Sequence, residues 1–357
     1  MSPTARHDSA RLARYGALVY ALVIIYASLN PFTGWRDNGV PLFDFFFAAW
    51  PRYWTAFDLF TNLAAYVPLG FLLFPALYSR LPRWLSVLLA LLLPAALSAG
   101  LETLQNFLPA RVPSNVDFGC NVLGGLLGVA LGLRFGGLFA DGGAVFRLRR
   151  DHMVSGRVGD AGLILMLLWL MTQMNPALLL FGHGDLRSLL GLAPALPYSA
   201  EGQVAVEWGI AVLGPLAAGL VAREVMRELH WPAIIGLLLA ALAVRGVSAG
   251  VILGGEHVLQ WATPGNKVGF VIGAGLLCMA LGLPSWARRA LAALCLLVGT
   301  ALANLAPENP YLLAPDSPAL VDQFFNFNGL TRLASVVWPF AALMWLMTPS
   351  SGTRARA

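Results

Sequence analysis

Residues 117–139 read DFGCNVLGGLLGVALGLRFGGLF, an apolar run with a carboxylate and an amide near its beginning. At 1.5 Å per residue, a helix of this length crosses the roughly 30 Å hydrocarbon core of a bilayer. One face of the helix carries, at every third or fourth residue, Asp117, Asn121, Gly124, Gly128 and Gly132. Small residues spaced in this way let another helix approach closely. The run therefore predicts a membrane-spanning helix that packs through a glycine face bearing polar groups.

The whole chain has the composition of a membrane protein. Its 357 residues are 58% hydrophobic and only 11% charged, which is far more apolar than a soluble domain. Apolar runs long enough to span a bilayer as helices fall at about 15–30, 57–78, 84–107, 117–139, 160–181, 203–222, 232–253, 267–283, 287–305 and 330–347. We therefore predict an all-α, polytopic transmembrane helical bundle of about ten spans.

The positions of the cationic residues predict the orientation. Cytoplasmic loops are enriched in Lys and Arg, and an N-terminus placed inside puts most of the 23 cations in inner loops, among them Arg11, Arg14, Arg80, Arg83, Arg134, Arg223, Arg288 and Arg289. Both termini are then cytoplasmic, in a multi-pass protein of a bacterial cytoplasmic membrane. Because the net charge of +5 is spread over these loops, we expect membrane lipid as the partner and no nucleic acid. The sequence leaves the oligomeric state open.

A segment rich in Gly and Arg, residues 140–159, is the best candidate for a domain boundary. We expect a four-span membrane domain at 1–139, a cytoplasmic linker loop at 140–159, and a six-span domain at 160–357 whose role the sequence does not indicate. The three Cys and five His residues show no metal-ligand spacing. No metal or cofactor is therefore expected.

Acidic and amide residues collect at the same-side ends of the second, third and fourth predicted spans. In chain order they are Asp58, Asn62, Glu102, Gln105, Asp117 and Asn121, and the short loop before the last pair adds Arg111. An ionisable group inside a bilayer costs about 2.5 to 3.5 kcal/mol on insertion scales, so such groups persist mainly where they have partners or a function. If the spans pack together, the seven residues form one outward-facing polar binding site.

Helix capping is the simpler interpretation for two of the acids. Thr55-x-x-Asp58 and Ser114-x-x-Asp117 both match a capping box, in which the two side chains bind free backbone N–H groups at a helix start. Glu102 differs, because it lies near the C-terminal end of its helix, where the helix dipole disfavours an anion. It needs Arg111, a proton or a ligand.

Three motifs in this region occur in a fixed order. They are FDLFTN at 57–62, ETLQNFLPAR at 102–111, and DFGCN at 117–121 followed by glycines. Together they resemble the VanZ-like family, over about residues 15–139. The resemblance implies a membrane protein whose founding relative gives low-level resistance to the lipoglycopeptide teicoplanin, and it implies no known reaction. The six later spans lie outside it.

The first functional hypothesis is binding or handling of a cell-envelope amphiphile, either a lipid-linked precursor or a lipoglycopeptide. Arg111 would pair with a phosphate or carboxylate, and the amides of Asn62, Gln105 and Asn121 would hydrogen-bond the head group. Teicoplanin-type antibiotic resistance is one role that such binding would support.

Two alternatives stay open. In the first, the site is a hydrolase or transferase acting on an envelope lipid, with Glu102 as general acid or base and Asp58 or Asp117 ionised beside it. In the second, the chain is a secondary transporter that uses Arg245, which lies inside the seventh predicted span. A structural ion pair of Arg245 with Glu207, Glu256 or Asp322 is the rival explanation for this arginine.

Overall fold

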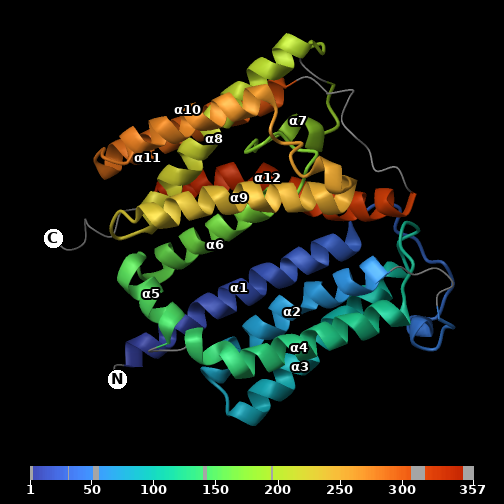
Figure 1. Ribbon diagram of the computed structural model, residues 1–357. Coiled ribbons are helices and arrows are strands. Elements are labelled where there is room, and N and C mark those ends of the chain that lie inside the picture. Colours follow the sequence, from blue (N-terminus) through green and yellow to red (C-terminus); the bar gives the residue numbers. More distant parts are fainter. Residues whose placement is uncertain are drawn as a thin grey trace. The chain divides into compact units, whose positions relative to one another are not determined.

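The computed structural model describes residues 3–30, 32–50, 56–139, 143–193, 196–306 and 318–348, and at 3–10, 56–57, 139, 145, 188–189 and 318–330 only the backbone is described. Within these residues the regular structure is helical (Figure 1), apart from one isolated bridge between Met153 and Met226. The predicted all-α fold is confirmed. The chain divides into two compact units, Met1–Arg149 and Arg150–Ala357.

The first unit is a bundle of four long helices: α1 (Pro3–Leu29), α2 (Ala56–Tyr78), α3 (Arg83–Gln105) and α4 (Asn115–Phe139). They lie side by side in Figure 1, and a 3₁₀ turn, η1 (Asp44–Phe46), lies between α1 and α2 in the chain. The connections from α2 to α3 and from α3 to α4 are short and make these neighbours antiparallel, and Gln105 at the end of α3 bonds Ser28 at the end of α1. As a result α1 and α3 end, and α2 and α4 begin, at the same end of the bundle.

The glycine face predicted for residues 117–139 packs against α2. A Cβ atom built on Gly124 would lie 2.1 Å from the carbonyl oxygen of Leu63, and one on Gly128 would lie 2.1 Å from that of Val67. A Cβ on Gly70 of α2 would lie 2.2 Å from the carbonyl oxygen of Gly125. No other residue fits at such separations, so the two backbones are in direct contact. This contact fixes the polar residues of α2 and α4 beside each other.

The second unit contains the helices α6 (Gly156–Thr172), α7 (Leu186–Leu189), α8 (Ala200–Val225), α9 (Trp231–Leu253), η2 (Gly255–His257), α10 (Pro264–Ala280), α11 (Ser285–Leu305) and α12 (Pro318–Leu346). α8 is the central helix, since it packs against α6, α9, α10 and α11. Most of its C-terminal half is buried in an apolar core that includes Trp169 and Trp338.

The segment predicted as a linker contains a further helix, α5 (Ala144–His152). Just after it, the backbone N–H of Val154 donates to the carbonyl of Val225 at 2.9 Å, and that of Arg227 donates to the carbonyl of His152 at 2.9 Å. The chain between the two predicted domains is thus ordered at residues 143–159 and joined to the end of α8.

Seven of the described helices are long and apolar enough to cross a membrane: α1, α2, α3, α4, α8, α9 and α11. The chain is therefore a multi-pass membrane protein. The predicted span at 160–181 ends as a helix at Thr172, because Pro176 disfavours helical geometry at Asn175 and the chain turns there. The spans predicted at 267–283 and 330–347 correspond to the shorter helix α10 and to the C-terminal part of α12. The count of about ten spans, and the side on which the termini lie, stay predictions.

Candidate functional site

The start of α4 brings the first group of predicted site residues together. The hydroxyl of Ser114 accepts the backbone N–H groups of Val116 and Asp117 at 3.2 and 3.3 Å, which caps the helix. The carboxylate of Asp117 is hydrogen-bonded to Asn62 on α2 and is close enough to Asp58 for the two acids to repel each other. The carboxylate of Asp117 therefore bonds another helix. It does not accept the backbone N–H of Ser114, as a capping box would require.

Glu102 of α3 takes the place that Asp117 would have in the capping box. Its carboxylate accepts the backbone N–H of Ser114 at 2.9 Å, across the connection from α3 to α4. The side chain is only 4% exposed, and it lies within electrostatic range of both Asp117 and Arg111. One backbone donor satisfies only part of the hydrogen-bonding capacity of a carboxylate. Glu102 is thus buried, with one acid and one arginine in its surroundings.

Asn121 extends the polar group toward the interior of the bundle. Its amide nitrogen donates to the hydroxyl of Ser98 on α3 at 3.0 Å, and Ser98 also hydrogen-bonds Tyr66 on α2, which lies within electrostatic range of Glu102. Asn121 is 5% exposed, and its carbonyl oxygen Oδ1 has no hydrogen-bond partner among the described residues. A buried acceptor without a donor is unfavourable by about 1 to 3 kcal/mol. This oxygen is the clearest open position in the site.

The other two predicted site residues bind the end of α1 instead. The guanidinium of Arg111 donates to the carbonyl oxygens of Ala27 and Asn30, with distances of 2.8 to 3.1 Å. The amide of Gln105 donates to the carbonyl of Ser28 at 3.0 Å. These contacts satisfy carbonyl groups that a helix leaves free at its C-terminus. Arg111 and Gln105 thus hold the end of α1, although Arg111 stays within electrostatic range of Glu102. Asp117 bonds Asn62 and lies within electrostatic range of Asp58 and Glu102, and Asn121 follows one turn further along α4.

We name these five residues, Asp58, Asn62, Glu102, Asp117 and Asn121, the polar line. Sequence reasoning missed two side chains that join it, Tyr66 and Ser98. Each lies four residues from a predicted site residue on the same helix, Tyr66 after Asn62 and Ser98 before Glu102. Because residues four apart share a helix face, this spacing could have identified both.

The segment after α1 covers the same end of the bundle. The amide of Asn115 donates to the carbonyl of Ala48 at 2.7 Å, and that of Asn106 donates to the carbonyl of Leu42 at 3.1 Å. The ring of Phe46 packs edge-on against Phe118, with ring centroids 4.9 Å apart. Residues 32–50 therefore pack beside the start of α4, next to Asp117.

The second unit holds Arg245, the residue on which the transport alternative depends. It is 5% exposed, and its guanidinium donates to the carbonyl oxygens of Asn175 and Leu178 in the turn that follows α6. Of its predicted partners, Glu207 hydrogen-bonds Gln203 and Thr263, Glu256 is 3.6 Å from His257, and Asp322 lies outside the described side chains. Arg245 forms no ion pair among the described residues. It stabilises an irregular turn.

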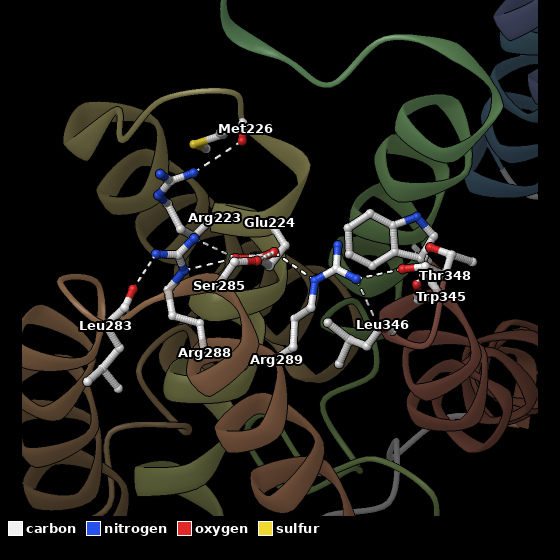
Figure 2. A network of polar contacts seen from close by, with 10 residues as sticks. All are labelled: Arg223, Glu224, Met226, Leu283, Ser285, Arg288, Arg289, Trp345, Leu346 and Thr348. Carbon is white, nitrogen blue, oxygen red and sulfur yellow. Dashed lines mark hydrogen bonds and ion pairs between the residues drawn. The ribbon is translucent and has the colours of Figure 1, made fainter. Parts of the chain in front are cut away.

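A buried carboxylate with a full set of partners joins three helices of the second unit. Figure 2 shows Glu224 at the end of α8 between two arginines of α11. Its oxygens lie 2.7 Å from Arg288 and 2.8 Å from Arg289, and the hydroxyl of Ser285 donates to it at 2.6 Å. Arg289 also donates to the carbonyls of Leu346 and Thr348 at the end of α12. This network was not predicted, since the sequence shows the Arg pair but not its partner.

Among the described residues, no group of His, Cys, Asp and Glu could hold a metal ion. The chemistry that the polar line can perform is hydrogen bonding, binding of a cationic group and proton transfer by its carboxylates.

The first unit was also compared with known families. Residues 8–136 match the VanZ/LLP1 family model. The resemblance to the VanZ-like family is thereby confirmed for this part of the chain, and α1 to α4 form a VanZ-like unit that holds the whole polar line. A search of curated proteins and a search of solved structures each gave no match.

Proposed function

We propose that the VanZ-like unit binds the polar head group of a cell-envelope amphiphile, a lipid-linked precursor or a lipoglycopeptide of the teicoplanin type. The observation that carries the proposal is the composition of the polar line. Three carboxylates share one region with Arg111, whose donors are directed to α1, and Asn121 keeps a buried acceptor open. Such a site favours a ligand that donates hydrogen bonds, through hydroxyl or ammonium groups. Pairing of Arg111 with a phosphate stays a prediction.

The distribution of charge supports an outward-facing site in a bacterial cytoplasmic membrane. Arg14 in the N-terminal half of α1, Arg80 after α2 and Arg134 in the last turns of α4 lie toward the end of the bundle opposite to the polar line. Because Lys and Arg mark the cytoplasmic side, the polar line then opens to the outer leaflet, where a lipoglycopeptide or a translocated precursor is found.

Acid–base catalysis on an envelope lipid is the second candidate. Glu102 is buried and receives one backbone hydrogen bond, whereas Asp117 is half-buried and hydrogen-bonded to Asn62. Two carboxylates in different environments are the requirement for an acid and a base. A change in the mass of a bound lipid substrate, abolished in Glu102→Gln, would favour this candidate over binding alone.

Binding is tested on the full chain in lipid nanodiscs. Two probes are titrated, teicoplanin and a polyprenyl pyrophosphate-linked disaccharide. We expect saturable binding of at least one of them, weakened about tenfold or more by Asp117→Asn, because a hydrogen bond to a charged group contributes about 1.5 to 3 kcal/mol.

Asp37→Asn is the matched control for this titration. Asp37 lies in the exposed segment after α1, where its carboxylate accepts the backbone N–H of Gly39 at 2.8 Å. The substitution removes the same charge and should leave binding unchanged. The proposal fails if neither probe binds, or if the two substitutions weaken binding equally.

A further inference from the structure

The VanZ-like unit also contains an apolar groove that extends from the end opposite to the polar line toward the middle of the bundle. It has a volume of about 530 Å³ and lies between α1, α2 and α3. Its walls are leucines and alanines of the three helices, and its charged lining residues are Arg14 and Arg80. The volume falls within the range of about 300 to 1,000 Å³ that is usual for small-molecule sites.

The length of the groove matches one leaflet of a bilayer. On α2 the lining runs from Leu69 to Leu77 and on to Arg80 just beyond the helix, a distance of about 16 Å at 1.5 Å per residue. Half of the hydrocarbon core of a bilayer is about 15 Å thick. When the arginines lie at the level of the lipid head groups, the apolar part of the groove therefore reaches the bilayer midplane.

The two arginines are available to a ligand. Neither guanidinium forms a hydrogen bond or an ion pair with any part of the chain that the structure describes, and the groove has no acidic residue in its lining. Arg14 is half-buried, Arg80 is exposed, and Leu18 beside them is exposed at the groove. A pair of cations at one end of an apolar channel is complementary to a molecule with an anionic head and a hydrocarbon tail.

We infer that this groove binds one anionic phospholipid from the leaflet on the arginine side. An acyl chain lies along Leu73 and Leu77, and the phosphate lies between Arg14 and Arg80. This site is separate from the polar line and does not depend on the function proposed for it. It gives the VanZ-like unit a fixed lipid contact at its basic end.

The test is native mass spectrometry of the full chain, titrated with phosphatidylglycerol or with phosphatidylcholine of the same acyl chains. We expect one phosphatidylglycerol to bind with at least about tenfold preference, since each Arg near an anionic head group contributes about fivefold. The Arg14→Gln, Arg80→Gln double variant should lose this preference. Arg134→Gln, which removes a charge at the same end but outside the groove, should keep it.

Two further experiments distinguish binding of the lipid tail from binding of its phosphate. Ala21→Phe narrows the groove without changing its charge and should weaken phosphatidylglycerol binding. Inorganic phosphate should not displace the bound lipid. Equal binding of the two lipids, an equal loss in Arg134→Gln, or displacement by inorganic phosphate would each overturn the inference, and the arginine variants decide it even where Ala21→Phe fails to fold.

Discussion

Glu102 and Glu224 are both buried glutamates near the C-terminal ends of apolar helices, 4% and 8% exposed. Glu224 has two arginines and a hydroxyl as partners, which satisfy its charge within the fold. Glu102 has one backbone donor, a second acid nearby and an arginine directed to α1. Removal of a completely paired buried carboxylate destabilises the protein, because its partner charges are left buried without a counter-charge. One with incomplete pairing indicates a ligand or a proton.

The largest effect is expected from Glu224→Gln, which leaves two arginines close together without a counter-charge. Breaking a buried ion pair is unfavourable by about 3 to 5 kcal/mol, so the midpoint of thermal unfolding in detergent should fall by about 5 to 10 °C. Glu228→Gln is the matched control, because Glu228 is exposed four residues further on. A fall no greater than in this control would remove the structural role assigned to Glu224.

A smaller effect is expected from Arg111→Ala. It removes the donors that cap the end of α1, and loss of such charge-assisted bonds should lower the midpoint of unfolding by about 2 to 5 °C. Arg36→Ala serves as its control, since Arg36 is exposed and its side chain bonds the nearby Asn38. An unchanged midpoint together with lost probe binding would instead assign the guanidinium of Arg111 to the ligand.

Helix faces were predictable from the sequence, because they follow from the helical period alone. The stripe from Asp117 to Gly132 does pack closely against another helix, and Asp58, Asn62 and Asp117 do meet. The VanZ-like motifs located the same residues. The contact between α2 and α4 was predictable because it depends on small residues that recur along one helix face.

Contacts between distant segments were not predictable in the same way. The free carbonyl groups at the end of α1 are backbone groups and have no sequence motif, so nothing indicated that Arg111 and Gln105 would bind them. Hydropathy also counted residues 173–181 as part of a span, although Pro176 disfavours a helix there. Nothing in the sequence indicated that Arg245, about 70 residues away in the chain, would bind the carbonyl groups of this turn. Where a polar group finds its partner is a property of the packing.

The most direct test of the central claim is a side-by-side measurement of Glu102→Gln and Glu224→Gln, by thermal unfolding and by binding of the same two probes. If the role of Glu102 is to bind a ligand, Glu102→Gln should change the unfolding midpoint by no more than about 2 °C. Glutamine still accepts the N–H of Ser114, and the substitution removes one repulsive charge. Probe binding should nevertheless fall about tenfold. A midpoint that falls as far as in Glu224→Gln, with probe binding unchanged, would contradict the account.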